Sequence, residues 1–226
     1  MTPNPSLERT STGMALGPRG ARCHHPPRGP SAMPVSAPQL KREPAPVAPM
    51  HLEYIRTAEN ELPPVSDPLA VRSLKVWYCK FKSLARLANF RNVEHLVIAG
   101  YPDTSFEVLS GLPKLRRLEL LHFPKATDLA PLGSLVALEA LSLACLPSWD
   151  SSGKRHQVKS LSPLCSLPKL TAIELLGVVP VDDSLNALAA SQVLKSVRLS
   201  GYPSSEAERF FLATGAINAF LPREAG

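Results

Sequence analysis

The side chains best suited to chemistry in this sequence are two glutamates and one cysteine–histidine run. Glu119 and Glu174 each stand between two large apolar residues in similar short segments, and paired carboxylates can serve as general acid and base. The run Cys23-His24-His25 contains residue types that ligate zinc. The sequence contains no Gly-rich phosphate-binding loop, nucleophile elbow or HExxH motif. What these few candidates can do depends on the elements that hold them.

Those elements come from an internal repeat. Six segments follow the pattern L-x-x-L-x-x-L-x-L, beginning at residues 71, 90, 112, 135, 167 and 191. The spacings are 19, 22, 23, 32 and 24 residues, and the fourth spacing contains an insertion. In the first segment the pattern is matched by Val71, Leu74, Trp77 and Cys79. Apolar residues that alternate at the end of each segment predict a half-buried strand.

A second apolar pair, three residues apart, follows most of the predicted strands and suits one or two helical turns. The pairs are Phe106/Leu109, Leu129/Leu132, Leu161/Leu164 and Leu185/Leu188. A strand and a helical turn in each of several units of about 20 to 29 residues are typical of leucine-rich repeats. The segment Thr127-Asp-Leu-Ala-Pro-Leu132 resembles the returning segment of bacterial internalin-like repeats.

This resemblance implies an α/β solenoid, a right-handed leucine-rich-repeat superhelix with a parallel concave sheet and short helical turns on the convex side. The chain departs from the family at the end of the strand. The asparagine expected there is replaced by large apolar residues such as Tyr101 and Phe123, and most of these residues are followed by proline. The backbone groups that the asparagine serves in the family must therefore find other partners.

Composition divides the chain into a tail and a repeat array. Residues 1–49 hold eleven of the 24 prolines and few apolar residues, so we expect a disordered, Pro-rich, basic tail. We expect an N-terminal cap at 50–70, about six repeat units at 71–203 and a C-terminal helical cap at 204–226, because the ends of a solenoid expose apolar surface. In the last segment Ser205-Glu-Ala-Glu208 matches a capping box.

The tail also resembles a translated bacterial integron attachment site. Residues 2–10, 17–20, 25–30 and 37–42 carry this resemblance, which implies a cassette gene and makes Met50 a candidate start. An ordinary low-complexity leader is the alternative interpretation. The tail contributes +4 of the net charge of +6. Charge in a flexible tail favours only weak, salt-sensitive attraction, so we expect no specific nucleic-acid partner.

Composition also bears on location. The sequence contains neither an apolar run of about eighteen residues that could span a membrane nor the apolar core of a secretory signal. The four cysteines show no paired spacing. We therefore expect a cytoplasmic protein without disulfides and without a membrane partner. The two resemblances imply a bacterial protein, and we expect a monomer.

The residues between the strand leucines are expected to face the concave side, where repeat proteins bind their partners. The candidate protein-binding residues there are Tyr78, His95, Arg117, Glu119, His122, Glu174 and Arg198. The alternative is a solvated strand face whose opposite charges pair with one another, which contributes only a few tenths of a kcal/mol for each pair.

The insertion at 148–159 is the second candidate surface. It contains Trp149, Lys154 and Arg155, and Trp and Arg are enriched where binding energy is concentrated. Insertions in repeat arrays become loops on one rim. Alternatively, Trp149 packs against a neighbouring repeat and the remainder is a loop.

No enzyme is predicted. Glu119 and Glu174 would lie two repeats apart, with backbones about 10 Å apart on an open face, and Cys23-His24-His25 lacks a second ligand pair. We expect no catalytic residues, no cofactor and no metal. Two functions remain: a scaffold that binds an unidentified protein through the concave face or the insertion, or an orphan cassette-encoded structural protein with no dedicated partner.

Overall fold

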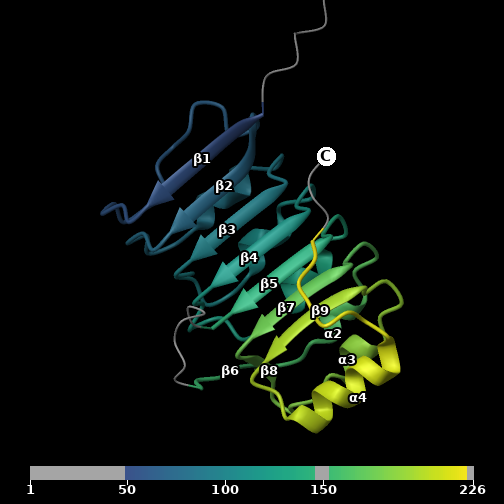
Figure 1. The fold of residues 1–226 in the computed structure, drawn as a ribbon. Helices are drawn as coiled ribbons and strands as arrows, with labels where there is room; N and C mark the ends of the chain where they lie inside the picture. Colours follow the sequence, from purple (N-terminus) through teal and green to yellow (C-terminus); the bar gives the residue numbers. More distant parts are fainter. Residues whose placement is uncertain (1–48, 146–152, 223–226) are drawn as a thin grey trace, which may run out of the picture. The chain divides into compact units, whose positions relative to one another are not determined.

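The computed structural model describes residues 49–145 and 153–222. Its main element is a parallel sheet of seven strands in the order β1-β2-β3-β4-β5-β7-β9 (Figure 1). The strands are β1 (Met50–Ile55), β2 (Val71–Trp77), β3 (His95–Ala99), β4 (Arg117–Leu121), β5 (Ala140–Ala144), β7 (Ala172–Leu176) and β9 (Ser196–Ser200). A separate parallel pair is formed by β6 (His156–Val158) and β8 (Val178–Pro180). Part of the predicted insertion is therefore a strand.

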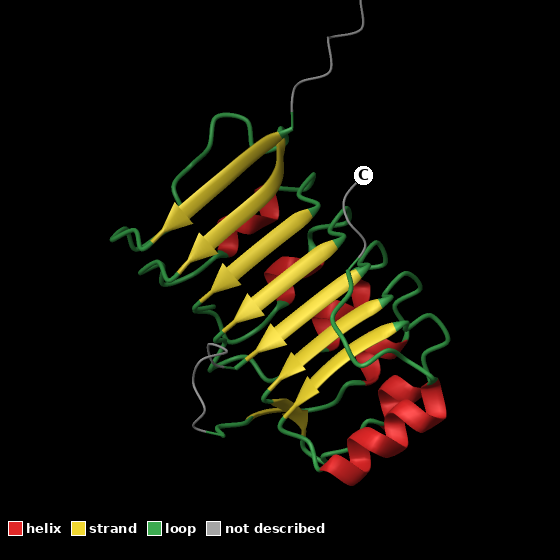
Figure 2. Cartoon of the chain, viewed as in Figure 1, coloured by secondary structure: helices red, strands yellow, loops and turns green. Residues whose placement is uncertain are grey.

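Short helical segments lie on one side of the sheet (Figure 2). They are η1 (Ala85–Asn89), α1 (Glu107–Ser110), η2 (Ala130–Ser134), α2 (Ser162–Cys165) and α3 (Asn186–Ala189). The longer helix α4 (Ser204–Thr214) lies beyond β9 at the end of the array. This succession of strand, turn and helical segment confirms the predicted α/β solenoid. The predicted tail, apart from Pro49, and Trp149 lie outside the described residues.

The core lies between the sheet and the helical segments. Two rows of side chains from neighbouring strands line it, one running from Leu74 through Leu118 to Val197 and one from Val76 through Leu120 to Leu199. Leucines of the helical segments, such as Leu109 and Leu132, close it from the other side and are fully buried. Because each unit buries its apolar residues against its neighbours, the repeats form one continuous core.

The structure corrects the predicted register of the first repeat. Leu74 lies opposite Leu96 and Val76 opposite Ile98, so Val76, and not Trp77 or Cys79, follows Leu74 in the core. The distance between equivalent residues is then 22 positions from Leu52 to Leu74 and again from Leu74 to Leu96. The predicted frame placed Trp77 opposite Leu96, a slip of three residues. An odd slip moves every side chain of a strand to the opposite face.

β1 extends the same repeat by one strand. It pairs with β2 along its length, with Leu52 opposite Leu74 and Ile55 opposite Trp77. Residues 50–70, predicted as an N-terminal cap, thus begin with a strand of the main sheet. Between β1 and β2 the side chain of Leu62 is buried, with 1% of its surface exposed.

A residue with left-handed backbone geometry directly follows most strands of the sheet. Arg56, Tyr78, Gly100, His122, Gly177 and Gly201 have φ between 47° and 88°, and each directly follows its strand. At Gly177 a Cβ would lie 2.5 Å from Cys145 Sγ, so only glycine fits there. Hydrogen bonds continue past the strands, because Gly100 N–H donates to Leu121 O at 2.7 Å and Tyr101 N–H to His122 O at 2.9 Å.

These hydrogen bonds supply the partners that the missing asparagine would provide in the family. The backbone groups at the strand ends pair with the next repeat, and buried aromatic rings fill the space that an asparagine would occupy. Tyr101 and Phe123 are 1% exposed and both pack on Phe106. The Tyr101 hydroxyl donates to Ser105 O at 2.8 Å. Burial raises the pKa of Tyr101 well above its usual value, with a smaller contribution from Asp103.

Short polar side chains start the helical turns. Ser105 Oγ accepts from Glu107 N–H at 3.1 Å, Asp128 Oδ1 from Ala130 N–H at 2.9 Å, and Asp182 Oδ1 from Ser184 N–H at 3.2 Å. These local bonds satisfy donors that a helix start leaves unpaired. The hydrogen bond from Lys159, together with the bond from Ala130, lowers the pKa of Asp128.

The contacts that hold helix α4 differ from the predicted capping box. The predicted capping box does not form, since helix α4 has no side-chain hydrogen bond at its N-cap, Pro203. Glu206 instead reaches the start of α3, where its Oε1 accepts from Leu185 N–H at 2.6 Å. The hydrogen bond from Arg209 and then that from Leu185 lower the pKa of Glu206. Phe210 is buried and joins α4 to the core.

Candidate functional site

Opposite the helical segments, the sheet presents its other face, which we call the open face (Figure 2). Because strand side chains alternate, three rows of residues cross this face from strand to strand. The first row is Ser73, His95, Arg117, Ala140, Ala172 and Ser196. The central row is Lys75, Val97, Glu119, Ser142, Glu174 and Arg198. The apolar row is Ile55, Trp77, Ala99, Leu121, Ala144 and Leu176.

The structure brings five of the predicted binding residues onto this face. His95 and Arg117 belong to the first row, and Glu119, Glu174 and Arg198 to the central row. His122 follows β4 at the strand-end position with positive φ. Tyr78 was expected beside Val97 in the middle of the face, but the corrected register places it at the strand-end position equivalent to His122. Lys75 occupies the place predicted for Tyr78.

The charges of the central and first rows are paired with one another. Arg117 Nε donates to Glu119 Oε1 at 2.7 Å. Glu174 accepts from Ser142 Oγ at 2.6 Å and from Arg198 at 3.1 Å, and 12% of its side chain is exposed. Each glutamate is therefore already engaged as an acceptor, and Ser142 separates the two in the sheet. This arrangement resembles a charge-balanced surface more than a pair of carboxylates prepared for acid–base chemistry.

Sequence reasoning missed the apolar row. Its residues occupy six neighbouring strands. Trp77, Leu121 and Leu176 are partly exposed, whereas Ala99 and Ala144 between them are 0% and 6% exposed. Ile55 at one end is 51% exposed. The pattern Leu120-Leu121 and Leu175-Leu176, two adjacent leucines of which only the first is needed for the core, was the available sign in the sequence. Trp77 was missed because the predicted frame of the first repeat placed it in the core, opposite Leu96.

A shallow groove of about 260 Å³ lies along the apolar and central rows. Trp77, Leu121 and Leu176 line it on the apolar side, and Glu119, Glu174 and Arg198 on the charged side. The ammonium group of Lys75 lies 5.6 Å from the centre of the Trp77 ring, which is a cation–π distance. The groove thus joins an apolar strip to a rim of paired charges, as in the centre and rim of a protein interface.

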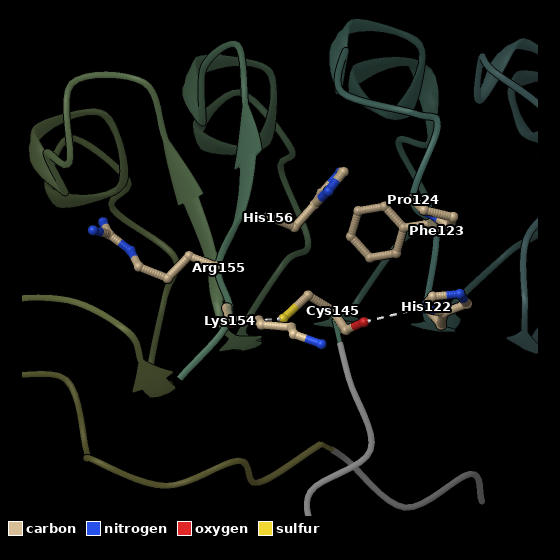
Figure 3. Close-up of a pocket in the computed structure, with 7 residues that line it drawn as sticks. All are labelled: His122, Phe123, Pro124, Cys145, Lys154, Arg155 and His156. Carbon is tan, nitrogen blue, oxygen red and sulfur yellow. Dashed lines mark hydrogen bonds between the residues drawn. The ribbon is translucent and has the colours of Figure 1, made fainter. Parts of the chain in front are cut away.

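A second hollow lies at the strand ends, near the insertion (Figure 3). His122 Nδ1 lies 3.4 Å from Cys145 O, and Cys145 Sγ lies 3.3 Å from Lys154 O. His156 packs edge-on against Phe123 and hydrogen-bonds Ala126 O at 2.8 Å.

The two described residues of the insertion candidate, Lys154 and Arg155, both line this hollow. In Figure 3, Arg155 extends away from Cys145 and His122, and its guanidinium pairs with Asp183. Lys154 contributes to the wall of the hollow. Among residues 49–145 and 153–222, no group of three or more His, Cys, Asp or Glu side chains is placed to hold a metal ion. No helix in this part of the chain is long and apolar enough to cross a membrane.

The fold and the open face define the class of protein. Parallel strands at a basic period of 22 residues, each leading into a short helical segment, form a leucine-rich-repeat solenoid. The same fold occurs in solved structures of other proteins. An internalin (inlF) from Listeria monocytogenes is similar to this chain with a TM-score of 0.52 and 19% identity, over 72% of this chain and 44% of that one.

An internalin C2 (inlC2) from the same organism is also similar, with a TM-score of 0.43 and 22% identity, over 58% of this chain and 53% of that one. The chain therefore spans about half the length of these solved structures. At 19% identity the likeness to the internalin (inlF) shows the fold alone, and that fold is the one predicted from the resemblance to internalin-like repeats. No protein-family model matches the chain, and no curated protein matches it.

Proposed function

We propose that this chain is a protein-binding scaffold that holds its partner along the apolar row of the open face. The observation that carries the proposal is the continuity of that row over six strands. At about 4.8 Å between strands the row is about 24 Å long. Single exposed apolar residues are ordinary, but a contiguous apolar strip bordered by polar groups is typical of an interaction site.

The order of side chains in the row favours a partner with regularly spaced apolar residues. The large residues Trp77, Leu121 and Leu176 alternate with Ala99 and Ala144, so the large ones recur about every 9.6 Å. Residues seven positions apart on an α-helix are separated by about 10.5 Å. An amphipathic helix laid across the strands therefore matches this spacing. The paired charges of the central row would form the polar rim beside it.

A shallow groove also favours a protein over a small molecule. Sites that enclose a drug-sized ligand are usually concave cavities of about 300 to 1,000 Å³, whereas this groove has about 260 Å³ and lies along a sheet face. The engaged glutamates support binding rather than catalysis. We further propose that the scaffold acts as a monomer without a cofactor.

A second function is supported by one observation. Because Glu119 and Glu174 are both paired within the chain, the open face needs no partner to satisfy its charges. An orphan structural protein without a dedicated partner would show the same pairing. The two proposals differ in what they expect of the apolar row, which only the scaffold uses.

Affinity capture from the source cell distinguishes them when matched variants are compared. Leu121→Asp with Leu176→Asp places charge in the apolar row, whereas Val136→Asp places it at a 58% exposed site outside the sheet. A scaffold loses its captured protein in the first variant and keeps it in the second, with both variants folded by circular dichroism. Capture of the same proteins by all three chains would refute binding through the apolar row. A loss confined to variants of Lys154 and Arg155 would move the site to the insertion.

A further inference from the structure

The chain folds its own C-terminal segment onto the open face. After α4, Ile217 forms a parallel bridge to Ser196: Val197 N–H donates to Ile217 O and Ile217 N–H to Lys195 O, both at 2.9 Å. Leu221 N–H then donates to Ser196 Oγ at 3.3 Å. The Phe220 ring lies 6.0 Å from the Arg117 guanidinium carbon. In Figure 1 this segment passes in front of the starts of β9 and β7.

These contacts bring the side chain of Phe220 toward the first row. Arg117 belongs to β4 and Ser196 to β9, and β5 and β7 lie between those strands in the sheet. Because Ile217 and Leu221 both bond at β9, it is the side chains of Phe220 and Arg117 that approach each other across β5 and β7. The first-row residues of the strands from β5 to β9, Ala140, Ala172 and Ser196, are at most 3% exposed, although they face away from the core.

Side-chain size along the first row matches this cover. Ser73 and His95, on strands that the segment does not reach, remain partly exposed. On the covered strands the row is reduced to two alanines and a serine, which leave room for another backbone to approach. The serine supplies a hydroxyl that accepts a hydrogen bond from that backbone. The covered part of the row thus has the features of a docking surface for extended chain.

We propose that Ala140, Ala172, Ser196 and Arg117 form a binding surface for an extended polypeptide segment with an aromatic side chain, and that residues 216–222 occupy it in the free protein. The segment is held by few bonds. Ile217 and Leu221 are 57% and 58% exposed, and the Phe220 ring contacts the open face through a cation–π contact of modest strength with Arg117. A partner segment of the same chemistry can therefore displace it.

This surface is separate from the apolar row, and its test does not depend on the binding role proposed for that row. It also needs no knowledge of the natural partner, because the chain's own sequence provides the probe. The probe is a fluorescent peptide of residues 215–222, added in trans to full-length chains. A peptide with alanine in place of Phe220 is the control.

The wild-type chain occupies its surface in cis, whereas Phe220→Ala in the full chain removes the ring that contacts Arg117 and leaves its place open to the ring of the peptide. We expect the wild-type peptide to bind the Phe220→Ala chain at least about tenfold more tightly than the wild-type chain, by fluorescence anisotropy. The control peptide should bind neither chain. Adding Arg117→Ala to the Phe220→Ala chain should weaken binding of the wild-type peptide.

Leu221→Pro provides a second route to the same test if Phe220→Ala disturbs folding. It removes the N–H that reaches Ser196, at a residue whose side chain is mostly exposed. Equal binding of the peptide to the wild-type chain and to folded variants would overturn the proposal, because the peptide would then bind elsewhere. Failure to bind any folded variant would overturn it as well.

Discussion

Leu118 and Leu121 lie on the same central strand but face opposite sides of the sheet, so truncating each one tests the register directly. Leu118 is fully buried between Leu96 and Leu141 in the core. Leu118→Ala removes three carbons there, about 2.4 kcal/mol at about 0.8 kcal/mol for each buried carbon. The cavity adds to this, so the expected loss of unfolding free energy is about 3 to 5 kcal/mol. Leu141→Ala should cost a similar amount.

Leu121→Ala should cost much less. Its side chain lies in the apolar row and is partly exposed, so the loss stays below the about 2.4 kcal/mol of full transfer, and no closed cavity adds to it. The measurement is urea unfolding followed by circular dichroism, with the wild-type slope required in each variant so that midpoints report stability. Equal losses for Leu118→Ala and Leu121→Ala would show that the strand register, and with it the apolar row, is wrong.

Three further predictions follow from the same structure. Val76→Asp should lower the unfolding free energy by more than Trp77→Asp does, because only Val76 lies in the core, where a carboxylate has no water to solvate it; the reverse order in urea unfolding would restore the original frame. A chain that begins at Met50 should melt within a few degrees of the full chain in a thermal scan, since the tail composition cannot contribute a core; a large drop would mean that the tail docks on the repeats. The folded-state pKa of Glu206 is lowered, so its carboxylate stabilises the fold above the unfolded pKa of about 4.3, and this stabilisation is lost as pH falls through the folded pKa. Glu206→Gln should therefore reduce stability at pH 6 and have little effect near pH 3, and an equal effect at both would contradict the assignment.

Much of the fold was predictable because the information is local and repeated. The apolar residues Leu96, Leu118, Leu141 and Ile173 recur with the same neighbours, so one alignment defines strand, turn and core for each central repeat. The helical pairs such as Leu129/Leu132 were predicted for the same reason, and the polar residue that starts each turn lies within two positions of the donor it satisfies. Short-range patterns of this kind depend on backbone geometry alone.

The first repeat and the open face depended on contacts between distant residues. The first repeat fits two overlapping frames, and its pairing with β3 decides between them. The residues that fit are Val71, Leu74, Val76, Trp77 and Cys79. The alternation along each strand correctly placed Glu119, Glu174 and Arg198 on the open face. It did not reveal that these charges pair with one another, because pairing depends on side chains from different strands.

The contact of the C-terminal segment with the first row was the feature least predictable from the sequence. Ala140, Ala172 and Ser196 have the composition of an ordinary exposed strand face, and Phe220 that of a core residue in a terminal cap. The contact between Phe220 and Arg117 joins positions 103 residues apart. Loop closure over such a length has no local signature, since its free energy depends only weakly on the intervening residues. The sequence by itself determined the repeat and its core, and the tertiary structure decided which part of the open face remains available for binding.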